Sequence, residues 1–186
     1  MNINNIKEKI FDSQNLTVQE TMFLFNLIMS GKISEIEVAG ILIALKTKGE
    51  TKDEILGAAK TMRDKCINIS SPNNAVDTCG TGGDMSGTLN ISTCSAIVAA
   101  SAGVVIAKHG NRSISSKSGS ADMLESLGYK ISNNIDSIKL SLETENFCFL
   151  FAQFHHSAMK NVLNVRKNLK TRTIFNLLGP LTNPAK

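Results

Sequence analysis

The sequence lacks a paired-cysteine motif, a leader-like start and any apolar run long enough to cross a membrane. Its four cysteines, Cys66, Cys79, Cys94 and Cys148, form no Cys-x-x-Cys pair and lie mostly among apolar residues. We therefore interpret them as reduced core residues rather than disulfides or metal ligands. Residues 1–10 mix asparagine, lysine and glutamate with isoleucine, unlike a signal peptide. These absences favour a cytoplasmic protein with no membrane partner.

The excess of positive charge is also small, since 20 basic minus 16 acidic residues gives +4. Such a balance suits anionic small molecules, and an ordinary solvated surface explains it equally well. It makes nucleic acid an unlikely ligand, because the helices carry acids too. A non-catalytic protein that binds nucleic acid through basic patches is nevertheless kept as an alternative, because a lysine-rich surface could serve that purpose. The hydrophobic content of 42% is enough for one moderate core, or one core and a small helical annex.

Three glycines within four residues, Gly80, Gly82 and Gly83, form the most informative motif. Because glycine has no Cβ, successive backbone N–H groups of such a loop can approach a phosphate closely. The loop lacks both well-known phosphate fingerprints: the sixth position from Gly80 is Met85, and Gly87 is followed by threonine without the required lysine. The glycines alone also fit a tight turn. The segments that follow favour phosphate binding.

A strand, a helix and a second strand are predicted around this loop. Residues 75–79 and 104–107 have the short apolar pattern of strands, and residues 91–102 have that of a buried helix capped by Asn90 or Ser92. The three elements predict a βαβ crossover and a partly parallel sheet. Ligands of such sheets bind beyond the carboxyl ends of the strands, where the glycine loop lies.

The next segment, residues 108–120, contains two lysines, one histidine, one asparagine, one arginine and five serines. It leads into a predicted helix over residues 121–127. A helix that starts with serine and glycine offers N–H groups and the positive end of its dipole to an anion. The chain therefore supplies several anion sites, which fits a ligand with two separated phosphate groups better than a single phosphate.

Residues 1–70 predict a helical domain, and residues 71–186 predict part of an α/β domain. Three capping boxes open the helices of the first domain, at Thr17-x-x-Glu20, Ser34-x-x-Glu37 and Thr51-x-x-Glu54. The predicted helices there are 18–30, 35–47 and 52–66, with a weaker one over 3–10. Later elements are a helix over 135–145, a strand over 147–151 and a helix over 158–169.

Five motifs together resemble the anthranilate phosphoribosyltransferase family. They are Gly80-Thr81-Gly82-Gly83-Asp84, Asn90-Ile91-Ser92-Thr93, Lys108-His109-Gly110-Asn111-Arg112, Ser118-Gly119-Ser120-Ala121-Asp122 and the run from Arg172 to Pro184. The resemblance implies an α/β fold with an N-terminal all-helical domain and a partly parallel, incomplete sheet. It also implies transfer of phosphoribosyl from 5-phosphoribosyl diphosphate to the amine of anthranilate, with release of pyrophosphate, in tryptophan biosynthesis.

The resemblance further implies magnesium (Mg2+) as cofactor and a homodimer formed through the helical domain. Pyrimidine nucleoside phosphorylases share this architecture and bind phosphate beside a ribose, so they are a second alternative. The runs over residues 108–112 and 179–184 look like the transferase instead.

Site residues follow from the resemblance. The donor is expected to contact Gly80, Gly83, Asp84, Thr88, Asn90, Ile91, Ser92, Thr93, Lys108, His109, Gly110, Asn111, Arg112, Ser113, Ile114, Ser115, Ser116 and Ser120. The Ser92 hydroxyl is expected to bind the magnesium ion. Anthranilate is expected to contact Gly80, Asn111, His156 and Arg166. An arginine matches a carboxylate bidentately, while a lysine supplies a point charge to phosphate.

His109 is the candidate catalytic residue, as a base that takes the proton of the acceptor amine. A histidine in a polar loop equally often positions a ligand by hydrogen bonding. Members of the family run to nearly twice this length, and the other half carries further strands and an acidic pair for magnesium. We therefore expect these 186 residues alone to bind the donor weakly and to turn over little.

Overall fold

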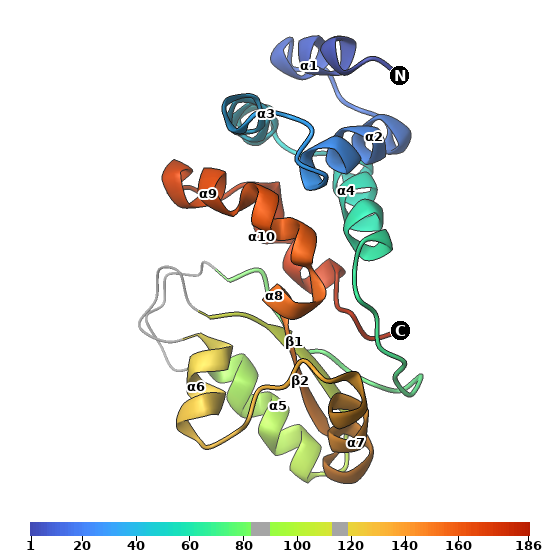
Figure 1. Cartoon of the computed structure of the whole chain (residues 1–186), viewed down its shortest axis with the longest axis vertical. Coiled ribbons are helices and arrows are strands. Elements are labelled where there is room, and N and C mark those ends of the chain that lie inside the picture. Colours follow the sequence, from blue (N-terminus) through green and yellow to red (C-terminus); the bar gives the residue numbers. More distant parts are fainter. Residues whose placement is uncertain (83–89, 113–118) are drawn as a thin grey trace. The chain divides into compact units, whose positions relative to one another are not determined.

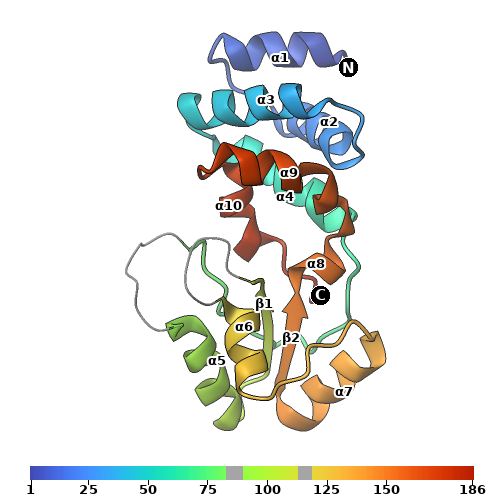
Figure 2. The same cartoon turned by 60° about the vertical axis from the view of Figure 1, so that its left-hand side comes forward.

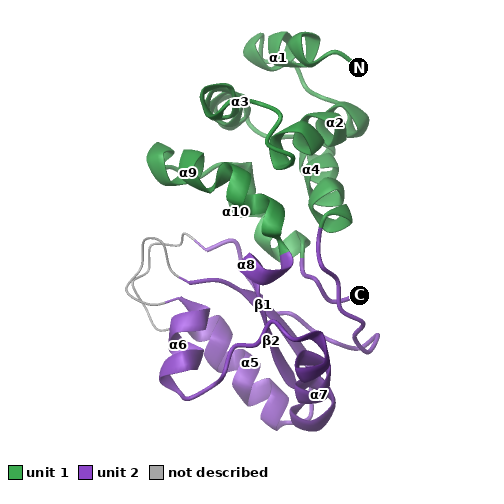
Figure 3. Ribbon diagram, in the orientation of Figure 1, with its two compact units in different colours: residues 1–65, 156–182 green, residues 66–155, 183–186 purple. Residues whose placement is uncertain are grey.

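The computed structural model describes residues 1–82, 90–112 and 119–186, and the chain divides into two compact units. Unit 1 comprises residues 1–65 and 156–182, and unit 2 comprises residues 66–155 and 183–186 (Figure 3). A single boundary near residue 70 was expected from the sequence. The observed units are instead each built from two segments, because residues 156–182 return to the helical unit.

Unit 1 is helical (Figure 1). Its elements are α1 (Ile3–Phe11), α2 (Val18–Met29), α3 (Glu35–Lys48), α4 (Lys52–Asp64), η1 (Ser157–Met159), α9 (Lys160–Leu169), α10 (Ile174–Leu178) and η2 (Gly179–Leu181). The capping boxes predicted at Thr17, Ser34 and Thr51 are all formed. Periodicity could not predict α10, which is only five residues long. Within the described ranges, every helix is too short or too polar to cross a bilayer.

The core of unit 1 joins helices from both of its segments. Phe25 of α2 and Phe175 of α10 have ring centroids 5.6 Å apart, and Val162 and Val165 of α9 lie in the same buried cluster. Helices α2 and α4 approach closely at Gly57, where a Cβ would lie 2.6 Å from the Val18 carbonyl oxygen. The helices after residue 156 are therefore part of the bundle core.

Unit 2 is an α/β unit. Its elements are α5 (Ile91–Ser101), β1 (Ile106–Gly110), α6 (Ser120–Ser126), α7 (Ile135–Glu145), β2 (Phe147–Phe151) and α8 (Ala152–His155). Strands β1 and β2 are parallel, with Ile106 opposite Phe147 and Gly110 opposite Phe151. The parallel sheet is confirmed, although β1 begins two residues later than predicted. The strand expected over 75–79 forms, within the described part of the chain, one parallel bridge between Val76 and Ile106.

Helices cover both faces of this small sheet (Figure 2). On one face, Phe147, Phe149 and Phe151 pack with α5 and α6. On the other face, Cys148 and Leu150 pack with α7. The alternation places the five buried residues of β2 in two cores, as a fully buried parallel strand requires. The carboxyl end of β1 thus lies in a rigid layered frame.

Unit 1 also contains a buried ion pair. The Lys48 ammonium donates to Glu54 Oε2 at 2.9 Å, and the two side chains are only 5% and 0% exposed. Glu54 accepts further hydrogen bonds from the backbone N–H groups of Leu16 and Thr51. Burial by itself would raise the pKa of Glu54, but these hydrogen bonds and Lys48 lower it below its ordinary value. The Glu54 carboxylate therefore connects the first turn of α4 to Leu16, just before α2, and to Lys48 at the end of α3.

Glu54→Gln should destabilise the helical unit by about 3 kcal/mol, since it leaves a buried ammonium without its charge partner. Lys48 keeps hydrogen bonds to Asn15 and Gly49, which limits the loss. Glu37→Gln is the matched control, because Glu37 occupies the same capping-box position on a solvated face. Urea unfolding followed by circular dichroism measures both variants.

The pKa of Glu54 gives this prediction a pH signature. A lowered pKa contributes stability above the ordinary value of 4.5, and that contribution disappears as pH falls through the lowered pKa. The deficit of Glu54→Gln should therefore shrink in acid. Equal unfolding midpoints for Glu54→Gln and Glu37→Gln at neutral pH would show that the buried pair carries no special weight.

Candidate functional site

The candidate site lies at the carboxyl end of β1 in unit 2. The Val76–Ile106 bridge places the segment that follows Val76 beside the strand that leads to Lys108. The described part of the glycine loop continues to Gly82, whose φ of +64° belongs to the region that favours glycine. The loop and the end of β1 are therefore neighbours, as the predicted crossover requires.

Lys108 is the buried cation of this site, with only 1% of its surface exposed. Its ammonium donates to the Thr78 hydroxyl at 3.0 Å, and that hydroxyl donates to the Ser92 carbonyl oxygen at 2.8 Å. Burial lowers the pKa of Lys108, while Asp77 and Cys79 act in the opposite direction. The Thr78 hydroxyl thus connects β1, the segment before the glycine loop and the first turn of α5.

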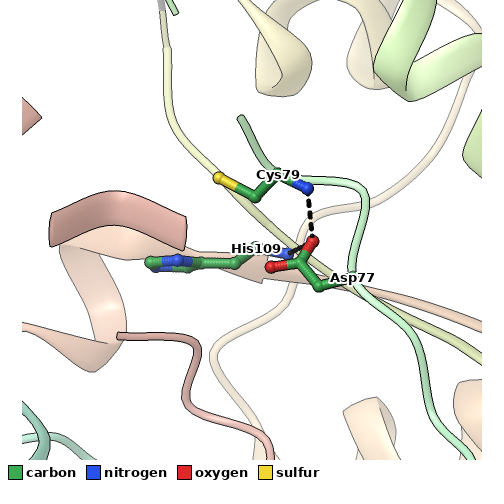
Figure 4. Close-up of side chains that lie close together, drawn as sticks. All are labelled: Asp77, Cys79 and His109. Atoms are coloured by element: carbon green, nitrogen blue, oxygen red, sulfur yellow. Dashed lines mark hydrogen bonds between the residues drawn. The ribbon is translucent and has the colours of Figure 1, made fainter. Parts of the chain in front are cut away.

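Asp77 joins three separate segments through its carboxylate. Oδ1 accepts the backbone N–H groups of Cys79 at 2.9 Å and His109 at 3.1 Å (Figure 4). Oδ2 accepts the Asn183 side-chain amide at 2.7 Å, and the same amide donates to the Ala107 carbonyl oxygen. Burial raises the pKa of Asp77, although Asn183, Cys79 and His109 act against that shift. The carboxylate thereby fixes the loop, the strand and residues 183–186 together.

His109, the predicted catalytic residue, is buried at 4% exposure in β1. Its backbone is fixed by Asp77. Burial therefore favours a positioned imidazole over a freely solvated one. The geometry of unit 2 is compatible with either role expected from the sequence, base or positioner.

Gly110 and Arg112 connect the end of β1 to α6. A Cβ on Gly110 would lie 2.8 Å from the Phe149 ring, so the close packing there requires glycine. Arg112 pairs bidentately with Glu125 at 2.6 and 2.7 Å and also contacts Asp122. Both acids raise the pKa of Arg112, Glu125 more strongly. Arg112, predicted to bind the donor, is thus already paired with α6.

The remaining predicted donor residues lie at the start of α5, at the start of α6, or outside the described residues. Asn90, Ile91, Ser92 and Thr93 form the start of α5, where the Thr93 hydroxyl donates to Asn90 at 2.8 Å. Ser120 begins α6, and the Gly119 N–H at that end is bonded by Asp122 rather than left open to an anion. The predictions for Gly83, Asp84, Thr88, Ser113, Ile114, Ser115 and Ser116 lie outside the described residues.

The acceptor residues expected from the sequence belong to different units. Gly80 and Asn111 are in unit 2, whereas His156 and Arg166 are in unit 1. The His156 ring bonds the Thr182 carbonyl oxygen at 2.9 Å and is buried. The Arg166 guanidinium lies 5.5 Å from the centroid of the Phe175 ring, and burial lowers the pKa of Arg166. Each of these two side chains has a fixed environment within unit 1.

Sequence reasoning missed three residues that organise the site: Asp77, Thr78 and Asn183. Asp77 and Thr78 directly precede the glycine loop, and Asn183 lies in the closing Gly-Pro-Leu-Thr-Asn-Pro run. The only signals were the predicted strand over residues 75–79, which contains Asp77 and Thr78, and the closing motif that contains Asn183. Their function depends on hydrogen bonds between positions up to 106 residues apart, which no local pattern reveals.

Comparison with known families agrees with this architecture. The helical bundle domain of the glycosyl transferase family matches residues 4–66, and the a/b domain of the glycosyl transferase family matches residues 72–186. The chain therefore belongs to the glycosyl transferase family.

Within this family the chain is similar to anthranilate phosphoribosyltransferases, which confirms the resemblance inferred from the motifs. The protein of Saccharolobus islandicus (strain L.S.2.15) is 54% identical over 185 residues, which are 100% of this chain and 53% of the relative. The chain thus spans about half the length of this curated relative. The phosphorylase and nucleic-acid alternatives are not favoured by these matches.

Solved structures give the same result. The crystal structure of anthranilate phosphoribosyltransferase from Thermus thermophilus has a TM-score of 0.90 at 42% identity, covering 97% of this chain and 55% of that one. The Saccharomyces cerevisiae enzyme in complex with PRPP and Mg has a TM-score of 0.87 at 29% identity, with the same shares covered. The fold of the two units is therefore that of this class.

Asp77→Asn should remove part of the hydrogen bonding that holds the glycine loop, β1 and residues 183–186 together. The amide has one acceptor oxygen, so either the two backbone N–H groups or Asn183 lose their partner, at a cost of about 1–3 kcal/mol. Hydrogen exchange should accelerate in peptides over 77–80 and 183–186. Asp136→Asn, on an exposed carboxylate of α7, is the control; unchanged exchange in Asp77→Asn would contradict the role of the carboxylate.

Proposed function

We propose that this chain supplies the phosphoribosyl-donor site of an anthranilate phosphoribosyltransferase, which transfers phosphoribosyl from 5-phosphoribosyl diphosphate to the anthranilate amine. The observation that carries the proposal is the buried Lys108 at the carboxyl end of β1, held by Thr78 beside the glycine loop and the start of α5. A buried ammonium beside a glycine loop suits a phosphate anion. The similarity to a yeast enzyme bound to PRPP and Mg supports this ligand.

The chemistry is a displacement at the anomeric carbon of the ribose. The bond to pyrophosphate breaks while the bond to the acceptor nitrogen forms, and negative charge grows on the departing pyrophosphate. Lys108 and the loop N–H groups would stabilise that charge electrostatically. The aromatic amine is neutral at pH 7, so it needs no activation beforehand, and His109 would receive or guide its proton late in the reaction.

Magnesium would neutralise phosphate charge when bound with the donor. Ser92 lies half-buried in the first turn of α5, and its hydroxyl is a hard oxygen ligand of the kind this ion prefers. One hydroxyl is a small part of an octahedral site, so donor phosphates and water would supply the other ligands. The residues present therefore fit a magnesium ion carried mainly by the substrate.

The acceptor residues of unit 1 inferred from the resemblance, His156 and Arg166, are each held by neighbours in that unit. Arg166 offers a planar fork that matches the carboxylate of anthranilate, and its contact with the Phe175 ring fixes the plane of that fork. The His156 ring is fixed by its bond to Thr182. Such fixed side chains favour orientation of a flat aromatic acid over a proton-transfer role.

Asn111, the acceptor residue of unit 2 that carries a side-chain amide, is held in the same way. Its Oδ1 atom accepts the backbone N–H of Arg112 at 2.8 Å and the side-chain amide of Gln153 at 3.4 Å. Both contacts use the oxygen, so the amide nitrogen is the atom that would donate to the carboxylate of the acceptor.

Lys108→Met should weaken binding of 5-phosphoribosyl diphosphate by about 10–100-fold, the equivalent of one charge-assisted hydrogen bond. Isothermal calorimetry with and without magnesium measures the effect. Lys130→Met removes the same charge from an exposed position of unit 2 and should leave the affinity unchanged. Circular dichroism confirms that both variants are folded.

Two results would contradict the donor site. One is equal affinity of Lys108→Met and the unaltered chain, and the other is a folded chain that binds no donor at millimolar concentration. Anthranilate fluorescence in the same sample then reports turnover. Because the chain spans about half of its relatives, we expect binding to exceed turnover.

We also propose that the helical unit pairs with a second copy of the chain. A groove of about 330 Å³ lies between α1 and α3, lined by Phe11, Gly40, Ile43 and Ala44 among others. Phe11 is 56% exposed, and Ile36, one turn before Gly40, is 86% exposed. Ser13, Thr47 and Lys48 complete the lining, so the groove is mixed in polarity. Such a groove beside exposed apolar side chains on the same helices suits a self-complementary twofold contact.

Gly40→Glu tests this interface without disturbing the fold, because nothing lies within 4 Å of the position of its Cβ. The carboxylate would project into the groove, so we expect the mass measured by light scattering to fall from dimer to monomer. Gly40→Ala fills the same position with one methyl group and should remain dimeric. A monomeric unaltered chain would contradict the pairing, and a dimeric Gly40→Glu variant would place the interface elsewhere.

A further inference from the structure

Three residues with different metal-binding groups meet beside the donor site. One ligand atom each from Asp77, Cys79 and His109 lie within 4.8 Å of one another. In Figure 4 the Cys79 sulfur, the His109 ring and a carboxylate oxygen of Asp77 face the same region. The cysteines were expected from the sequence to be core residues, but Cys79 is only half-buried. We infer that Asp77, Cys79 and His109 form a binding site for Zn2+ or a similar divalent transition metal.

The types of ligand determine which metal suits the site. A thiolate sulfur, an imidazole nitrogen and a carboxylate oxygen form a mixed set that zinc and cobalt accept. Magnesium instead prefers oxygen ligands and octahedral geometry. The site is therefore chemically distinct from the magnesium position expected at Ser92. Three protein ligands leave a fourth position for water, as in open zinc sites.

Hydrogen bonds to Asp77 already fix the backbone of the two other ligand residues, Cys79 and His109. Asp77 Oδ1 accepts the N–H groups of both Cys79 and His109, so the residues that carry the sulfur and the ring are fixed to the same carboxylate. A carboxylate offers about four acceptor positions, and Asn183 occupies one on Oδ2. A position on Oδ2 therefore remains for a metal, with the hydrogen bonds acting as supporting contacts.

The three ligand atoms need to move only slightly closer together to bind a zinc ion. Ligand atoms around a tetrahedral zinc ion are about 3.3–3.8 Å apart for ordinary bond lengths, against the observed limit of 4.8 Å. Rotation of the Cys79 and His109 side chains can supply a convergence of about 1 Å. Binding exchanges a proton for the metal: the Cys79 S–H bond breaks, the sulfur–metal bond forms and the proton leaves to solvent.

A bound divalent cation stabilises the Cys79 thiolate. Occupancy of the site should therefore depend on the concentration of free metal.

The site also has a consequence for the donor, which rests on the proposed function. Cys79 directly precedes Gly80, and His109 directly follows Lys108. A metal that draws Cys79 and His109 together would shift both the glycine loop and the end of β1 away from the geometry that binds the donor. We expect zinc to weaken donor binding even when magnesium is in excess.

Cobalt titration of the chelator-treated chain tests the site. Co2+ should produce a thiolate-to-metal charge-transfer band that saturates at one ion per chain and is removed by Zn2+ but not by excess Mg2+. Cys79→Ser should abolish the band, and His109→Gln should weaken cobalt binding at least tenfold. Cys94→Ser, which alters another half-buried cysteine of the same unit, should leave the band intact.

Two outcomes would overturn the inference: no charge-transfer band from folded chain, or a band that survives Cys79→Ser. Circular dichroism verifies that the variants fold. Donor calorimetry with magnesium and no zinc is run separately, so failure of the metal site and failure of the donor site can be distinguished. Donor binding that is normal in magnesium and unaffected by bound zinc would reject only the expected antagonism.

Discussion

The carboxylate of Asp77 is the constraint on which the rest of the candidate site depends. It bonds the backbone of the glycine loop, the backbone of β1 and the side chain of Asn183 at the same time. Among the described residues the sheet has two five-residue strands, and the other segments here add only isolated bridges. A half-buried carboxylate with three donors therefore replaces ladder hydrogen bonds at the point where the ligand site is formed.

Buried charge is handled differently in the two units. In the helical unit, Glu54 has Lys48 as a direct partner, and hydrogen bonds lower its pKa. In the α/β unit, burial raises the pKa of Asp77 and lowers that of Lys108. Lys108 is bonded to a neutral hydroxyl rather than to a carboxylate. A buried ammonium without a carboxylate partner is stabilised strongly when an anion binds beside it. This distinguishes the candidate ligand site at Lys108 from the structural ion pair of Lys48 and Glu54.

Local patterns predicted much of this fold. The capping boxes gave the starts of three helices, and the buried run over 147–151 gave β2, because both signals lie within a few neighbouring residues. The return of residues 156–182 to the helical unit could not be predicted, since it depends on packing between distant segments. The same holds for the site: the motifs indicated Lys108, but its partner Thr78 and the Asp77–Asn183 bond emerge only in three dimensions.

The most direct test of the donor site is hydrogen exchange with 5-phosphoribosyl diphosphate and magnesium added to the chain. Amides that bind phosphate exchange more slowly, because they are bonded and shielded. We predict slower exchange in peptides covering residues 77–82, 90–93 and 106–112, with no change in α1–α4. Unchanged exchange in those three peptides, or protection confined to the helical unit, would contradict a phosphate site at the end of β1.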